Sequence, residues 1–284
     1  MIGTSVIQRR MAFYDLEETT PAIRLNEVCF CYGRSVRRAA QGMVLRNFSV
    51  SVPRESVTAI LGPNGVGKTT LLNLVLGWLH PSSGSITLCG RRVANISRRE
   101  MGHMVSLVPQ DEHIPFEYTL LDFVLLGRAP HLSPLQAPRI SDVMVARDAL
   151  ETVGLSHLAN QSVGETSGGE KQLAMVARAL AQQPRILLMD EPTAHLDLKN
   201  KRRTVDLIHR LREQRVTVLF TTHDPEFASV AADRMILLEG GRLLADGPVD
   251  AVMTEDRLSR VFAMPLSLRR AATSGTATHS VVVW

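Results

Sequence analysis

The sequence predicts an α/β protein with a three-layer core around a mostly parallel sheet, a small antiparallel β lobe before it and a helical insert within it. Two apolar runs, Ile186 to Met189 and Val216 to Phe220, are typical of parallel strands that are buried on both faces. A glycine-rich loop, Gly62 to Thr69, stands between a strand candidate and a helix candidate. No internal repeat is visible, so we expect one such core.

The β lobe is predicted from the first part of the chain. Ile23 to Phe30 alternates polar and apolar residues, as a half-buried strand does, and Val44 to Val52 shows a similar pattern. A basic loop, Arg34 to Gly42, joins the two segments. We therefore expect antiparallel strands here.

The segments around the glycine-rich loop continue the α/β pattern. Ser56 to Leu61 is an apolar, partly β-branched strand candidate before the loop, and Thr70 to Leu76 is a helix candidate after it. Further strands are expected over Ser85 to Leu88 and Met104 to Val108, where Pro109 ends the second strand.

A mostly helical insert is predicted from about residue 115 to 172. Helices are expected over Leu120 to Leu126 and Asp142 to Val153, with a proline-containing loop between them. A third helix, beginning near Lys171, continues over Leu173 to Ala181 and leads back to the core.

The last part of the chain completes the core. Leu198 to Gln214 is a helix candidate between the two apolar strands, and Met235 to Ala245, with its Gly240-Gly241 pair, predicts a closing hairpin. Ala271 to His279 is rich in small polar residues, so we expect disorder there.

Composition narrows the functional class. The 284 residues are 45% apolar and 21% charged, and no apolar run is long enough to cross a bilayer. Residues 1–20 lack the continuous apolar stretch of a secretory signal, so we expect a cytoplasmic protein. Three scattered cysteines do not form a disulfide framework. The net charge of +4 suits an anionic lipid surface, whereas aromatic residues, at 5%, are too few to predict a nucleic-acid partner.

The glycine-rich loop matches the phosphate-loop pattern G-x-x-x-x-G-K-[ST] at every fixed position. Its glycines allow consecutive backbone amides to turn inward around a polyphosphate, and the following helix adds its positive N-terminal end. Lys68 brings a charge to the outer phosphates and Thr69 offers a hydroxyl to Mg2+. The predicted nucleotide-binding residues of the loop are Gly62, Pro63, Asn64, Gly65, Val66, Gly67, Lys68, Thr69 and Thr70.

Two adjacent carboxylates follow the apolar strand Ile186 to Met189. A carboxylate at the end of a buried strand holds Mg2+ directly or through water, and this role falls to Asp190. The next residue, Glu191, points in a different direction from Asp190. It is predicted to orient or deprotonate the water molecule that attacks the bound phosphate.

Further motifs follow in the order that they have in the ATP-binding cassette (ABC) family. Gln110 follows a strand, Thr166 to Glu170 precedes a helix, and His223 follows a buried strand that ends in Thr221-Thr222. Over roughly residues 23 to 250 the sequence therefore resembles an ABC-type ATPase subunit, which has a P-loop NTPase core.

The resemblance implies roles for these residues. Gln110 is similar to the glutamine that senses Mg2+ and the reactive water and that links the core to the insert. His223 is similar to the histidine that bonds the γ-phosphate of ATP, and Tyr32 to the aromatic residue that stacks on adenine. With Lys68 and Glu191, Gln110 and His223 form the expected catalytic set.

The segment Thr166 to Glu170 resembles the family signature, which is usually Leu-Ser-Gly-Gly-Glu/Gln. In the family this motif grips the γ-phosphate of ATP held by the other subunit. The residues that carry this role are Ser167, Gly168, Gly169 and Glu170. Thr166 departs from the usual Leu, which we expect to change packing more than function. Asp197 is similar to the acidic residue of the D-loop, which crosses the dimer interface.

The insert indicates which kind of cassette this is. Tyr118 to His131, which ends in Gly127-Arg128-Ala129-Pro130-His131, resembles a stretch in the cassettes of importers for iron-siderophore, haem and cobalamin. The resemblance implies a homodimer on the cytoplasmic face of the inner membrane, powered by ATP and Mg2+. Its partners would be integral membrane permease subunits and, indirectly, a periplasmic or extracellular substrate-binding protein.

Other assignments stay open. Molybdate and zinc importers have similar cassettes, and an exporter or a soluble cassette of iron-sulfur cluster assembly also fits a chain of this length. Translation cassettes usually come as two in one chain, and repair cassettes have a long coiled coil that the segment after Gln110 cannot hold. The expected organisation is an extension over residues 1–22, the ATPase domain over 23–250, and a partly disordered extension over 251–284.

Overall fold

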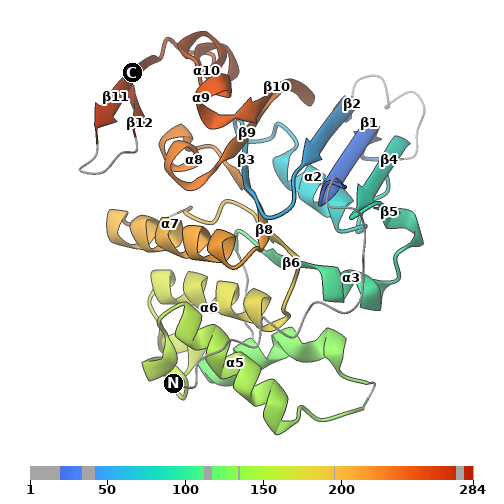
Figure 1. The fold of residues 1–284 in the computed structure, drawn as a ribbon, viewed down its shortest axis with the longest axis vertical. Helices are drawn as coiled ribbons and strands as arrows, with labels where there is room; N and C mark the ends of the chain where they lie inside the picture. The colour runs from blue at the N-terminus through green and yellow to red at the C-terminus, as the bar shows by residue number, and fades with distance from the viewer. Residues whose placement is uncertain are drawn as a thin grey trace. The chain divides into compact units, whose positions relative to one another are not determined.

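The computed structural model describes residues 20–33, 42–111, 117–133, 135–194, 196–272 and 278–283. The described chain divides into two compact units, which Figure 1 labels by element. We call Ser97–Val216 the helical unit, and Thr20–Ile96 with Thr217–Trp284 the phosphate-loop unit. Both units combine helices with strands, so the predicted α/β class is confirmed.

The phosphate-loop unit contains the predicted β lobe. Its strands pair antiparallel in the order β2 (Met43–Val52), β1 (Ile23–Cys31), β4 (Ser83–Leu88) and β5 (Arg91–Arg92). In β1, Ile23, Leu25 and Val28 are buried while the intervening side chains face outward. The alternation that is visible in the sequence is therefore the alternation of the two faces of this sheet.

The second group of strands in this unit surrounds the phosphate loop. β3 (Val57–Leu61) pairs in parallel with β8 (Thr217–Thr222) on one side and with β9 (Arg234–Glu239) on the other. β9 continues through a tight turn into its antiparallel partner β10 (Arg242–Pro248), as the predicted hairpin requires. All residues of β3 and β8 are buried, which explains their continuous apolar character.

Among the residues that the structure describes, this unit also contains five short helical elements. The helix α2 (Lys68–Val75) begins directly after the phosphate loop. The helix α8 (Pro225–Ala231) contacts β3 and β8, while α9 (Val249–Val252) and α10 (Glu255–Phe262) contact β9. A short 3-10 helix, η2 (Val93–Asn95), follows β5.

The expectation of disorder over Ala271 to His279 is wrong at both ends of that range. Residues Ser267–Ala272 form β11, and residues Thr278–Val283 form its antiparallel partner β12. β12 also contacts α8. The run Val281 to Val283 is β-branched and therefore favours a strand. The small polar residues before it suggested disorder instead.

The helical unit has a parallel pair of strands and a group of helices. β6 (Val105–Val108) pairs in parallel with β7 (Ile186–Met189), and α3 (Arg98–Met104) leads into β6. The helices α4 (Leu120–Leu125), α5 (Ile140–Thr152) and α6 (Gly168–Ala181) contact one another. The helix α7 (Leu198–Glu213) follows β7.

Two boundaries differ from the sequence expectation. Pro130 lies inside a 3-10 helix, η3 (Leu126–His131), where the sequence predicts a loop. The helix α6 begins at Gly168 rather than near Lys171, because the Ser167 side chain caps it. Two more 3-10 helices, η4 (Ser156–Leu158) and η5 (Val163–Glu165), connect α5 to α6. Among the described residues, no helix combines the length and the apolar character that crossing a bilayer requires.

Candidate nucleotide site

The phosphate loop joins the end of β3 to the start of α2. Gly65 and Gly67 adopt left-handed φ values of 78° and 110°, which other residues rarely reach. Gly67 is also the N-cap residue of α2, and the first turn of that helix carries no acidic side chain. The loop therefore ends at the positive N-terminal end of a helix, as an anion site requires.

The side chain of Lys68 is buried over this loop. Its ammonium donates hydrogen bonds to the carbonyl oxygens of Gly62 at 2.8 Å and Pro63 at 3.2 Å. These bonds compensate for the burial of the charge and hold it beside the loop amides. The next residue, Thr69, is exposed in the first turn of α2. Cation and hydroxyl thus lie next to each other at the loop.

His223 lies beside the same loop. The strand β8 is paired with β3, and the Gly62 amide donates to the carbonyl oxygen of Thr222 at 3.3 Å. His223 is the next residue and its side chain is exposed. Asp224 then caps α8 by accepting bonds from the amides of Glu226 and Phe227, each at 3.0 Å. The backbone on both sides of the histidine is therefore fixed.

Tyr32 lies at the start of α2 in space. Its hydroxyl is 3.0 Å from the Thr70 hydroxyl, and its ring stands edge-on to Phe30 with 4.9 Å between centroids. The residue is 57% exposed, so a face of the ring is open to a flat partner. The longer connection that the sequence shows after Tyr32, residues 34–41, lies outside the described residues.

The adjacent carboxylates follow β7 in the helical unit. The Asp190 amide donates to the carbonyl oxygen of Val108 at 2.8 Å, which places it beside the end of β6. Both Asp190 and Glu191 are buried. Glu191 has a left-handed φ of 47°, and strain of this kind concentrates at functional sites. Gln110 is exposed two residues after Val108, so it belongs to the same edge of the paired strands.

The signature segment is the N-terminal end of α6. The Ser167 hydroxyl donates to the Glu170 carboxylate at 2.7 Å and accepts from the Glu170 amide at 3.3 Å. The Ser167 amide donates to the same carboxylate oxygen at 2.8 Å, which completes a capping box. These bonds lower the pKa of Glu170 and keep it ionised. The Thr166 hydroxyl donates to the Val163 carbonyl oxygen at 2.7 Å, so this departure from Leu is satisfied locally.

Asp197 caps the neighbouring helix. Its carboxylate accepts a hydrogen bond from the Asn200 amide at 2.8 Å at the start of α7. A Cβ added at Gly169 would come within 2.4 Å of the Asn200 side-chain nitrogen, so α6 and α7 approach closely here. Sequence reasoning missed Asn200. The Asp-x-x-Asn spacing signals a helix start, but no pattern signals its contact with the signature.

The insert motif Gly127 to His131 is a clamp on the C-terminal end of α6. The buried Arg128 pairs with Asp142 of α5 at 3.0 Å, and also donates to the Ala181 carbonyl oxygen at 2.8 Å and to Gln183 at 3.0 Å. A guanidinium at this position satisfies the last carbonyls of a helix and complements its negative end. Asp142 is a second residue that sequence reasoning missed.

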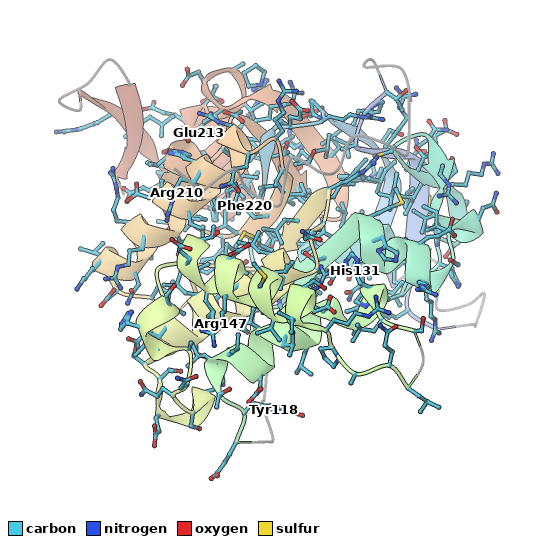
Figure 2. The ribbon with its side chains drawn as sticks, turned by 60° about the horizontal axis from the view of Figure 1, so that its bottom comes forward. Tyr118, His131, Arg147, Arg210, Glu213 and Phe220 are labelled. Carbon is cyan, nitrogen blue, oxygen red and sulfur yellow. The ribbon has the colours of Figure 1, made fainter. Side chains whose placement is uncertain are left out.

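The other residues of the motif explain why the contact is so close. A Cβ at Gly127 would come within 2.1 Å of the Arg178 carbonyl oxygen, so only glycine allows this approach of η3 to α6. His131, labelled in Figure 2, lies 2.9 Å from the Gln182 carbonyl oxygen and edge-on to His103. Burial lowers the pKa of His131, so its neutral ring donates that bond. The motif therefore holds η3 against the C-terminal end of α6.

The predicted residues therefore form two groups, one within each unit. The phosphate-loop unit brings together Tyr32, the loop and His223. The helical unit holds Gln110, the two carboxylates, the signature and Asp197.

Comparison with known proteins identifies this arrangement. The profile of the family described as ABC transporter matches residues 45–194, which is more than half of the chain. The chain belongs to the ABC transporter family. It is an ABC ATPase, and this family hydrolyses ATP in coupling to transport.

The ABC ATPase has relatives along about 80% of its length. A probable iron chelatin transport ATP-binding protein of Helicobacter pylori is 35% identical over 80% of this chain and 90% of its own. The molybdate import ATP-binding protein MolC of Haemophilus influenzae is 34% identical over 80% and 85%. Among solved structures, an inward-facing putative metal-chelate type ABC transporter is 31% identical with a TM-score of 0.80, over 93% of this chain and 98% of that one.

Proposed function

We propose that this ABC ATPase powers the uptake of a metal chelate, of iron-siderophore, haem or cobalamin type, through a separate membrane permease. The observation that carries the proposal is the similarity, over nearly all of both chains, to a metal-chelate type transporter. The Gly127 to His131 stretch in the insert supports it. Molybdate is the second candidate cargo, because the molybdate relative is almost as similar as the iron relative.

The phosphate-loop unit supplies the nucleotide pocket in this proposal. The loop amides and the N-terminal end of α2 bind the phosphates, Lys68 supports the outer phosphates, and Tyr32 stacks on adenine. ATP lies on the open face of Tyr32 and continues into the loop.

The residues fit Mg2+ by their chemistry. The Thr69 hydroxyl, the Asp190 carboxylate and the Gln110 side-chain oxygen are the hard oxygen donors that this ion prefers. Among the described residues no group of three acidic, histidine or cysteine side chains forms a ready-made cage. Mg2+ is normally held by one or two protein groups together with substrate phosphates, and when bound it neutralises charge on those phosphates.

Catalysis is assigned to residues at the ends of the paired strands. Glu191 accepts a proton from the attacking water, Gln110 orients that water, and His223 hydrogen-bonds the γ-phosphate. The signature residues Ser167 to Gly169 of a second copy close over the γ-phosphate, so that a twofold dimer contains two ATP molecules at its interface.

The remaining expectations follow from this role. Residues 23–250 are the ATPase domain, with extensions over 1–22 and 251–284. The dimer works on the cytoplasmic face of the membrane against permease subunits, and a substrate-binding protein delivers cargo from the opposite side. No nucleic acid takes part.

The test uses a form that binds ATP but does not hydrolyse it. Tagged Glu191→Gln protein is purified with ATP from detergent-solubilised membranes of its own host, with Lys68→Ala protein as the matched control that lacks nucleotide. A polytopic membrane protein in stoichiometric amount supports the transporter assignment, and uptake assays with labelled ferric chelate and molybdate then decide the cargo. Recovery of soluble partners alone contradicts it and favours a cluster-assembly cassette.

A further inference from the structure

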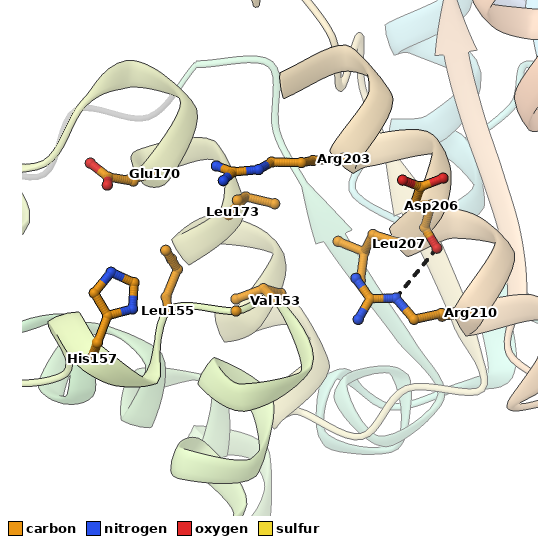
Figure 3. Close-up of a pocket in the computed structure, with 10 residues that line it drawn as sticks. Val153, Leu155, His157, Glu170, Leu173, Arg203, Asp206, Leu207 and Arg210 are labelled. Carbon is orange, nitrogen blue, oxygen red and sulfur yellow. Dashed lines mark hydrogen bonds between the residues drawn. The ribbon is translucent and has the colours of Figure 1, made fainter. Parts of the chain in front are cut away.

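A pocket of about 300 Å3 opens in the helical unit beside the signature (Figure 3). It lies between the N-terminal half of α6, the middle of α7 and the turn after α5. Its apolar wall consists of Val153, Leu155, Leu173 and Leu207. Its charged or titratable side chains are His157, Glu170, Arg203, Asp206 and Arg210.

Glu170 connects this pocket to the signature. It lines the pocket, and its carboxylate accepts the hydrogen bond of the Ser167 hydroxyl at 2.7 Å. Under the proposed function that hydroxyl must turn to the γ-phosphate held by the second copy. An ionised carboxylate one hydrogen bond away would repel the approaching polyphosphate.

Two other side chains of the same pocket, Arg203 and His157, lie near Glu170. Arg203 extends from α7 across Leu173 toward Glu170, and His157 approaches from η4 (Figure 3). After the larger effect of the hydrogen bonds from Ser167, the charges of His157 and Arg203 lower the pKa of Glu170 further. Both therefore act on its electrostatics.

Two other charged residues of the pocket, Asp206 and Arg210, form bonds within α7. Asp206 forms an ion pair with Arg202 at 3.0 Å, on the same helix. The Arg210 side chain donates to the Asp206 carbonyl oxygen at 3.4 Å (Figure 3). Of the arginines in the pocket, Arg203 is the one whose charge acts on Glu170.

We propose that Arg203 is a positioning residue for the signature: it offsets the charge of Glu170, so that the Ser167 hydroxyl leaves the carboxylate and binds the γ-phosphate of the second copy's ATP. The inference rests on the proposed function and adds a residue to it. A neutral glutamine at position 170 would need no such counter-charge.

The test measures ATP-driven dimerisation of Glu191→Gln protein by sedimentation over a range of ATP concentrations. Adding Arg203→Gln raises the ATP concentration for half-maximal dimerisation by about two- to fivefold, the effect of one exposed charge pair. Arg203→Lys keeps the charge and restores the original value. Arg202→Gln, on the same helix one residue away, leaves it unchanged. Thermal unfolding verifies that each variant is folded.

A double-mutant cycle separates this role from simple packing. In a Glu170→Gln background, Arg203→Gln has no further effect, because the charge that it offsets is gone. An equal effect of Arg203→Gln in both backgrounds, or none in the first, overturns the inference and leaves the proposed function standing. A Glu191→Gln parent that stays monomeric with ATP overturns the proposed function and this inference with it.

Discussion

The surroundings of Lys68 fit its proposed role in binding the outer phosphates of ATP. Its ammonium is buried and held by two loop carbonyls, so the charge is already placed where phosphates are expected. Lys68→Ala removes charge-assisted bonds to the outer phosphates, and we expect ATP affinity to fall about tenfold or more. Calorimetric titration with ATP measures this, and an unchanged thermal midpoint shows that the loop is intact. Wild-type affinity would contradict the assignment.

Glu191 is expected to separate binding from turnover. Its carboxylate is assigned as the base, while Gln has the same shape and adopts the same backbone conformation. Glu191→Gln should therefore lower the hydrolysis rate about 100-fold or more with little change in ATP affinity. Phosphate release and equilibrium nucleotide binding, measured on one preparation, check the two parts. A wild-type rate would show that another group takes the proton.

Residues that belong to local patterns could be predicted from the sequence. The loop from Gly62, the carboxylates after β7 and the Ser-Gly-Gly signature each depend on neighbouring residues, so their positions follow from short motifs. Asp142 and Asn200 could not be predicted in this way. Their partners lie on other helices, and only the folded chain brings them together.

At the scale of elements, the contact of η3 and α5 with the end of α6 depends on one buried ion pair. Breaking a buried pair leaves a charge without compensation, so Arg128→Met should lower the free energy of unfolding by about 3 kcal/mol or more. The exposed pair of Arg202 and Asp206 is the matched control, and Arg202→Met should cost under about 1 kcal/mol. Urea unfolding followed by circular dichroism measures both. Equal small effects would show that the clamp is dispensable.

The same pair predicts a pH dependence. Burial alone would raise the pKa of Asp142, but hydrogen bonds from Arg139 and Arg128 and the charge of Arg128 lower it overall. A lowered pKa in the folded state contributes stability above the unfolded value of about 3.9, and this is lost as the pH falls through the folded value. The stability difference between wild type and Asp142→Asn should therefore be constant near pH 6 and shrink below about pH 4. A difference independent of pH down to pH 3 would contradict it.

Elements with a clear pattern of apolar residues could be predicted from the sequence. Boundaries that are set by a single cap or turn could not. The alternation in β1 and the apolar runs of β7 and β8 mark these strands in the sequence. The start of α6 was predicted too late because the capping box, not the apolar pattern, sets it. The hairpin of β11 and β12 was missed because small polar residues mask a short β-branched strand.

At the scale of the whole molecule, the proposed dimer predicts that ATP protects backbone amides from hydrogen exchange in two different ways. In Glu191→Gln protein, ATP should slow amide exchange in the phosphate loop at any protein concentration, because one copy holds the phosphates. Slowing at Ser167 to Gly169 should instead disappear on dilution, because it needs a second copy. Hydrogen-exchange mass spectrometry at two protein concentrations measures this. Signature protection that survives dilution would argue against the shared site.

The family could be predicted at this scale because several motifs agree in order along one chain. The cargo could not be predicted from chemistry, because no cargo site is evident in the described part of the chain. Its proposed identity therefore depends on relatives, which carry both iron chelate and molybdate names.

The clamp has a mechanical consequence for the signature. The helix α6 is a continuous rod of 14 residues, about 20 Å long, with Arg128 bonded to one end and Ser167 at the other. The hydrogen bonds of Arg128 therefore join η3 to the same helix whose other end carries the signature serine.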